Sequence, residues 1–121
     1  MSALVWLAVP ALGALGALLR FFVDSWVGRR AGTAFPLGTL IVNTSGALVF
    51  GLLVGLGVGG DRLLLAGTAT IGSYTTFSTW MLETLRLAEE GRFAPAAANL
   101  AISVAVGLGA AALGRVIGAH L

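Results

Sequence analysis

Apolar residues fall into four long stretches along the chain, separated by short segments that hold most of the charges. Residues 1–19, 31–60, 63–82 and 93–114 contain no charged side chain. A helix needs about 20 apolar residues to cross a hydrocarbon core of about 30 Å, so each stretch can span a membrane. We predict transmembrane helices at about 3–27, 35–58, 62–89 and 95–119, in one domain covering residues 1–121.

The composition supports an all-α membrane protein. Hydrophobic residues make up 58% of the chain and charged residues 10%, with a mean hydropathy of +0.99, whereas soluble domains carry about 25% charged residues. A formal charge of +2 is too small to indicate a nucleic-acid partner. Without cysteine there is no thiolate chemistry. No His/Cys/Asp cluster is expected at membrane depth, so we do not predict an enzyme.

Polar residues crowd into the middle of the third apolar stretch. Its sequence from Gly72 to Glu83 is GSYTTFSTWMLE. Unpartnered hydroxyls are costly in hydrocarbon, and irregular backbone there must be buried in protein or line a wet cavity. Gly72 at mid-span predicts a broken helix, whose freed carbonyls can hold a cation and whose second half presents N–H groups to anions. The alternative is a continuous helix with hydroxyls bonded to earlier carbonyls.

Two polar positions in the first half of the chain each leave two interpretations open. Arg20 and Asp24 are four residues apart and can pair on one helix face. Arg20 is then either a snorkelling interface residue or part of a vestibule. Asn43, whose amide has two donors, either links helices or lines a pore.

The second half of the chain offers further candidates. Phe77 and Trp80 are three apart, so both rings can face one groove, although such pairs commonly serve packing. Glu83 is expected near the interface as a solvated carboxylate. Asn99 and Ser103 share one helix face, where they either satisfy a neighbouring helix or extend a polar track.

The arginines give only a weak preference for one orientation. With four spans, the side of the termini has two arginines and the other side has three or four. Arg62 and Arg115 are on the side of the termini. The other side has Arg29, Arg30 and Arg92, plus Arg86 if it reaches the interface. This small bias is compatible with insertion in both orientations. Since so small a chain encloses little by itself, we expect an oligomer, for which dual insertion allows an antiparallel two-fold dimer.

With these features described, the sequence resembles the Fluc fluoride channels, also called the CrcB family, over nearly its whole length. The resemblance rests on four segments in the family's order and spacing: GALGALLRFF, FPLGTLIVNTSGALVFGLL, GSYTTFSTWMLE and NLAISVAVGLG. It implies an antiparallel, dual-topology homodimer in the bacterial inner membrane. Such a dimer passes fluoride through two pores and holds a structural sodium ion at its centre.

The same resemblance implies roles for individual residues. Asn43 matches the pore asparagine, Phe77 the first pore phenylalanine, Glu83 the acid near the pore mouth, and Arg20 the first-helix arginine. The other implied pore positions are Ser78, Thr79, Ser103 and, at the second aromatic position, Trp80. The backbone carbonyls of Gly72 and Thr75 match the sodium ligands.

The chain departs from the family pattern at two places. The second aromatic residue is usually phenylalanine but is Trp80 here, and the usual GG or CG run before TTFST is replaced by Gly72-Ser73-Tyr74. Trp80 leaves two interpretations open: its aromatic edge and indole N–H are candidate ligands for the anion, or its larger ring narrows the route.

A rival hypothesis is a small proton-coupled multidrug exporter, which is also a four-helix, dual-topology dimer. That carrier needs a titratable carboxylate in the middle of its first helix. Here Asp24 lies too close to the helix end. A purely structural subunit is a third hypothesis, but it leaves the polar cluster at 72–83 unexplained.

Overall fold

A computed structural model describes residues 2–32 and 35–121, so residues 1, 33 and 34 of the predicted apolar stretches lie outside the described chain. The described chain is helical throughout, with short connections. The elements are α1 (Ala3–Ala31), α2 (Leu37–Gly55), α3 (Gly60–Leu63), η1 (Leu64–Ile71), α4 (Gly72–Tyr74), α5 (Ser78–Glu89) and α6 (Phe93–Ala119). Because α3, η1 and α4 follow one another without interruption, they form one rod, and α5 completes the third pass. The four predicted helices are confirmed, and the third is broken.

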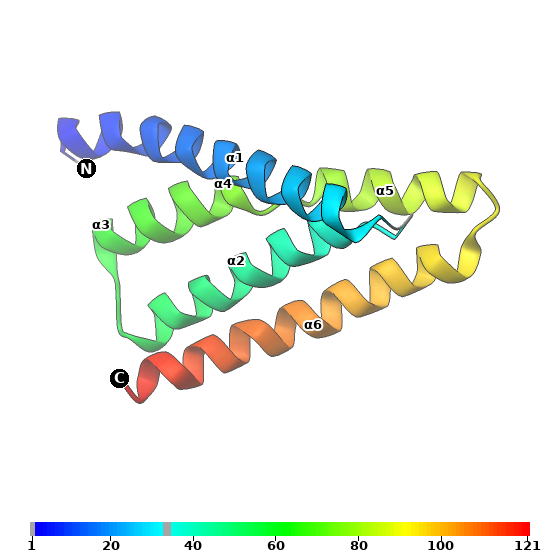
Figure 1. Cartoon of the computed structure of the whole chain (residues 1–121). Helices are drawn as coiled ribbons and strands as arrows, with labels where there is room; N and C mark the ends of the chain where they lie inside the picture. The colour runs from blue at the N-terminus through cyan, green and yellow to red at the C-terminus, as the bar shows by residue number, and fades with distance from the viewer. Residues whose placement is uncertain (1, 33–34) are drawn as a thin grey trace.

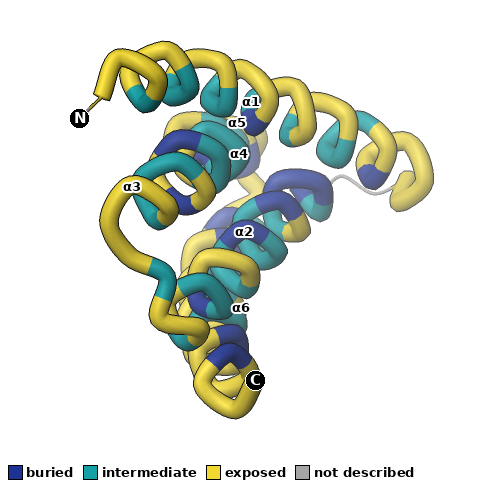
Figure 2. The backbone as a smooth tube through the Cα atoms, turned by 90° about the vertical axis from the view of Figure 1, so that its left-hand side faces the viewer, coloured by how far each residue is buried: buried dark blue, intermediate teal, exposed yellow. Residues whose placement is uncertain are grey.

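The four passes form a bundle with both termini at the same end (Figure 1). The first helix, α1, contacts η1, α2 and α4, whereas α6 packs on α2 and α5. Seen from the side in Figure 2, α1 and α6 therefore occupy opposite edges, with α2 and the broken helix between them. Because both termini lie at the same end, the chain crosses the bundle an even number of times.

Local signals explain where several helices begin and end. The Ser2 hydroxyl accepts the Val5 N–H at 3.3 Å and caps the start of α1. Gly32 ends the same helix with φ +60°, and Gly91 follows α5 with φ +75°, both in the left-handed region that glycine tolerates. In α6, Pro95 sits in the first turn, where its missing N–H removes no helical bond.

Helices α2 and α6 make the closest packing through small residues on both sides. A Cβ added at Gly51 would overlap the Ala111 carbonyl, and one added at Gly114 would overlap the Leu48 carbonyl. Gly55 lies in the same way against Arg115. Gly51 of α2 faces Ala111 of α6, and Gly55 faces Arg115, four residues further along both helices. The two helices therefore run parallel. Gly51 and Gly55, four residues apart, thus form a small-residue face on α2 that lets α6 approach closely.

The break lies three residues later than the sequence indicated. Gly72 is helical, with φ −60° and ψ −35°, whereas Thr75 is extended, with φ −78° and ψ 161°. A π-helical stretch precedes it, in which the Thr70 hydroxyl donates to the Leu65 carbonyl at 2.7 Å. Hydroxyls bonded to earlier carbonyls thus coexist with the break, because Thr75 also donates its hydroxyl to Ile71 at 3.1 Å.

Little of the apolar surface is buried within one chain. Buried residues face the centre of the bundle and exposed ones cover its outside (Figure 2). Among the described residues, three helices are long and apolar enough to cross a membrane: α1, α2 and α6. The exposed surface is itself apolar, with Leu7, Phe22 and Leu108 each more than half exposed. Lipid or another protein surface must cover such a face.

Candidate functional site

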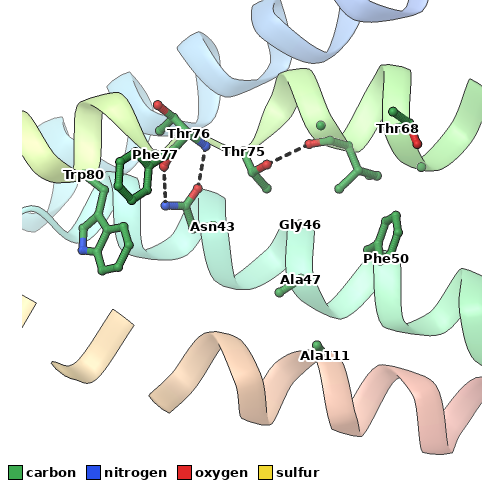
Figure 3. Close-up of a pocket in the computed structure, with 13 residues that line it drawn as sticks. Asn43, Gly46, Ala47, Phe50, Thr68, Thr75, Thr76, Phe77, Trp80 and Ala111 are labelled. Carbon is green, nitrogen blue, oxygen red and sulfur yellow. Dashed lines mark hydrogen bonds between the residues drawn. The ribbon is translucent and has the colours of Figure 1, made fainter. Parts of the chain in front are cut away.

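Asn43 on α2 holds the broken segment of the third helix. Its side-chain amide donates to the Thr76 carbonyl and its oxygen accepts the Thr76 N–H, both at 2.8 Å. Figure 3 shows these two bonds reaching from α2 to the break. Because Thr76 is 9% exposed, its main-chain groups need such partners. One N–H of the Asn43 amide forms no bond within the described chain.

The Thr76 side chain completes the break. Its hydroxyl oxygen accepts the Thr79 N–H at 3.2 Å and so caps the first turn of α5. The N–H groups of Thr76 and Thr79 are therefore not bonded to Gly72 and Thr75, the residues four positions earlier. As a result, two carbonyls at the C-terminal end of the α3–α4 rod are free of those bonds.

These carbonyls suit a cation. Carbonyl oxygen is a ligand for hard cations, and the C-terminal end of a helix carries partial negative charge. Gly72 and Thr75 both line the groove described next, so their positions are accessible from one side. The donor set of the chain thus fits the sodium ion that the resemblance implied.

An apolar groove of about 510 Å³ runs beside the break. Five of the predicted site residues line it: Asn43, Gly72, Thr75, Phe77 and Trp80. The Phe77 ring, 70% exposed, meets the Trp80 ring edge to face at a centroid distance of 5.8 Å and an interplanar angle of 83°. Both rings of the predicted aromatic pair therefore border the same space (Figure 3).

A smaller, more polar cavity of about 230 Å³ lies between α1, α2 and the break. Arg20, Asp24 and Thr79 line it, but no ion pair joins Arg20 to Asp24 in the described chain. The Asp24 side chain instead packs against Gly38, where a Cβ would overlap its carboxylate. Thr76 lines both this cavity and the groove, so it separates the two spaces.

The remaining predicted residues line neither the groove nor the polar cavity. Glu83 lines a separate pocket of about 230 Å³ with Arg86, and one of its carboxylate oxygens is buried without a hydrogen-bond partner in the described chain. Its environment is drier than the solvated rim expected from sequence. Ser78 is exposed at the start of α5. Ser103 donates to the Asn99 side chain at 3.5 Å, at the contact of α5 with α6.

Sequence reasoning overlooked two residues of the site. Thr76 was part of the TTFST segment but received no role, although it takes part in three hydrogen bonds that hold the break. Thr39 lines the polar cavity, is 3% exposed, and has its side chain beside the Glu83 carboxylate. Its spacing of four residues from Asn43, which places both on one face of α2, was a usable signal.

The fold and the site define a multi-pass membrane protein with a broken third helix. A family model described as "CrcB-like protein, Camphor Resistance (CrcB)" matches residues 7–115. The chain is 54% identical to fluoride-specific ion channel FluC 2 of Mycolicibacterium paratuberculosis, covering 92% of this chain and 91% of the relative. It is 51% identical to FluC 2 of Mycobacterium tuberculosis H37Rv (92% and 88%) and 49% identical to FluC 1 of Streptomyces avermitilis (90% and 91%). The chain therefore belongs to the CrcB family, whose named relatives are fluoride channels.

Proposed function

We propose that the chain conducts fluoride passively out of the cytoplasm of a bacterium, as an antiparallel, dual-topology homodimer in the inner membrane. The relatives named as fluoride-specific channels support the substrate. The need for export follows from acid chemistry. Hydrogen fluoride crosses membranes as a neutral molecule and dissociates at cytoplasmic pH, which traps the anion inside unless a channel releases it.

The observation that carries the proposal is the clamp of Asn43 on Thr76. It uses one amide N–H and leaves the second available beside the groove. A fluoride ion that sheds water needs donors in its place, and a rigidly held amide supplies one without reorganisation.

Further weak hydrogen-bond donors lie on both sides of Asn43, where they would bind the ion before and after it passes this residue. On the groove side, the edges of the Phe77 ring carry the positive part of the aromatic quadrupole. On the other side of Thr76, the polar cavity offers the Thr39 hydroxyl and the Arg20 side chain. Several moderate sites suit conduction, because each binds the ion without holding it.

A second copy of the chain would complete both the groove and the cation site. The carbonyls of Gly72 and Thr75 supply two ligands from one chain, and a copy related by a two-fold axis would supply two more. In this proposal a sodium ion there is structural and satisfies the backbone groups that the break leaves free.

The exporter hypothesis has less support. In α1 the only acid is Asp24, which packs on Gly38 near the end of the helix. No relative reported above is named as a drug exporter.

The test of this proposal is fluoride efflux from liposomes, followed with a fluoride electrode. The purified wild type is compared with Asn43→Asp, which keeps the acceptor for Thr76 but adds negative charge and removes both amide donors. We expect rapid efflux from the wild type and loss of efflux in the variant. Equal efflux from both folded proteins would remove Asn43 from the route, and no efflux from a folded wild type would refute the function.

A further inference from the structure

A buried polar network joins α5 to α6 behind the aromatic pair. Its centre is Asn99, which is 1% exposed and is one of the two largest side chains that are fully buried in the described chain. Sequence reasoning left open whether this residue satisfies a neighbouring helix or extends a polar track. The contacts below favour the first interpretation and give it a purpose.

Four hydrogen bonds make up this network, and two of them join Asn99 directly to α5. The Trp80 indole N–H donates to the Asn99 main-chain carbonyl at 3.1 Å. The Asn99 amide donates to the Thr84 hydroxyl at 2.8 Å, and that hydroxyl donates to the Trp80 main-chain carbonyl at 2.8 Å. Ser103 donates to the Asn99 side-chain oxygen at 3.5 Å. Trp80 is thus bonded at its indole nitrogen to Asn99 of α6, and its main-chain carbonyl accepts from Thr84 of α5, to which the Asn99 side chain donates.

This arrangement decides which part of Trp80 borders the groove. An indole has one polar atom, its N–H, which can donate a single strong bond. That bond goes to α6, so the N–H suggested above as an anion ligand is already engaged. The ring of Trp80 remains against Phe77 at 5.8 Å. Trp80 therefore presents only weakly polar ring atoms to the groove, as a phenylalanine would.

We propose that Asn99 is a positioning residue for fluoride conduction: its buried side chain ties α6 to α5 through Thr84 and so holds the main-chain carbonyl of Asn99 where it accepts the Trp80 indole N–H and keeps that N–H away from the ion route. This inference rests on the proposed function, because it assigns the second aromatic position its role there. An indole N–H released into the groove would be a stronger donor than a ring edge and would retain the anion. Asn99 thereby keeps tryptophan compatible with a path of weak sites.

The direct test observes the indole N–H of Trp80. Trp6 and Trp26, both more than half exposed, are replaced by phenylalanine, which leaves Trp80 as the only indole. Hydrogen exchange of its N–H is then followed by NMR in this background with and without Asn99→Leu. The variant retains a main-chain carbonyl at position 99 but loses the side-chain bond to Thr84, so α6 is no longer tied to α5 there and the carbonyl no longer holds the indole N–H. We expect exchange about fivefold faster or more in the variant, the factor of one hydrogen bond of ordinary net strength. Unchanged exchange would overturn the proposal.

Conduction provides the second readout through a double-mutant comparison. Asn99→Leu is expected to lower fluoride efflux several-fold when Trp80 is present, and to have no effect relative to Trp80→Phe alone, because phenylalanine has no N–H to release. An equal loss in both backgrounds would show a merely structural role and overturn the proposal. Leu100→Val, on the neighbouring exposed position of α6, is the matched control.

A second variant covers the case in which Asn99→Leu does not fold. Thr84→Val removes the same link from the α5 side and should accelerate indole exchange in the same direction. If the wild type shows no fluoride efflux, the proposed function fails. The hydrogen-exchange rate of the Trp80 indole N–H does not depend on transport. Comparing it between the two proteins still decides whether Asn99 positions Trp80.

Discussion

The clamp at the helix break makes a quantitative prediction for Asn43→Leu. The substitution keeps the side-chain volume roughly constant but removes both 2.8 Å bonds to Thr76. Thr76 is 9% exposed, so its N–H and carbonyl would be left without partners. Each lost bond that leaves a buried group unsatisfied costs about 1–3 kcal/mol, and membrane interiors favour the lower end. We therefore expect Asn43→Leu to lower the free energy of unfolding by about 2–4 kcal/mol.

The assay is unfolding of the purified protein in mixed micelles with increasing denaturing detergent, followed by tryptophan emission. Ile41→Ala, at a position on the same helix that is 42% exposed, is the control and should change stability far less. A loss of under about 0.5 kcal/mol in Asn43→Leu, the range of ordinary surface changes, would mean that the clamp does not hold the break.

Three further predictions concern packing, the Tyr74 hydroxyl and sodium. Gly51→Ala should cost about 1–3 kcal/mol of stability because its methyl group overlaps the Ala111 carbonyl, whereas Gly107→Ala, with nothing within 4 Å, should be tolerated by the single chain; equal thermal stabilities of the two variants would contradict the α2–α6 packing. Tyr74→Phe removes a 2.9 Å bond to the Ser45 hydroxyl and should cost about 0.5–1.5 kcal/mol in the same unfolding assay, and no loss would show that the bond contributes nothing. Replacing sodium by a large organic cation should weaken the proposed dimer, measured by cross-linking yield against sodium concentration, and a yield independent of sodium would remove the ion from the account.

The sequence predicted those features that depend on patterns within one helix. The four helical passes followed from charge-free length, and the common groove of Phe77 and Trp80 followed from their spacing. The break was foreseen but misplaced, because glycine was taken as its cause. The structure keeps Gly72 helical and breaks the chain where Asn43, 33 residues from Thr76 in the sequence, replaces the helical bonds.

Contacts between helices explain what sequence reasoning could not supply. Whether the Trp80 N–H was free depended on a carbonyl of α6, and carbonyls leave no trace in a sequence pattern. The expected pairing of Arg20 with Asp24 was reasonable from their spacing alone. It does not form because Asp24 packs on Gly38 of the next helix.

The central claim is passive and selective fluoride conduction, and the most direct measurement is electrogenic efflux from liposomes loaded with potassium fluoride. A conducted anion leaves only until the membrane potential opposes it, so rapid release should begin when valinomycin gives potassium a parallel path. Liposomes loaded with potassium chloride should show no comparable release. Fluoride release that ignores valinomycin, equal release of chloride, or no release from a folded protein would contradict the account.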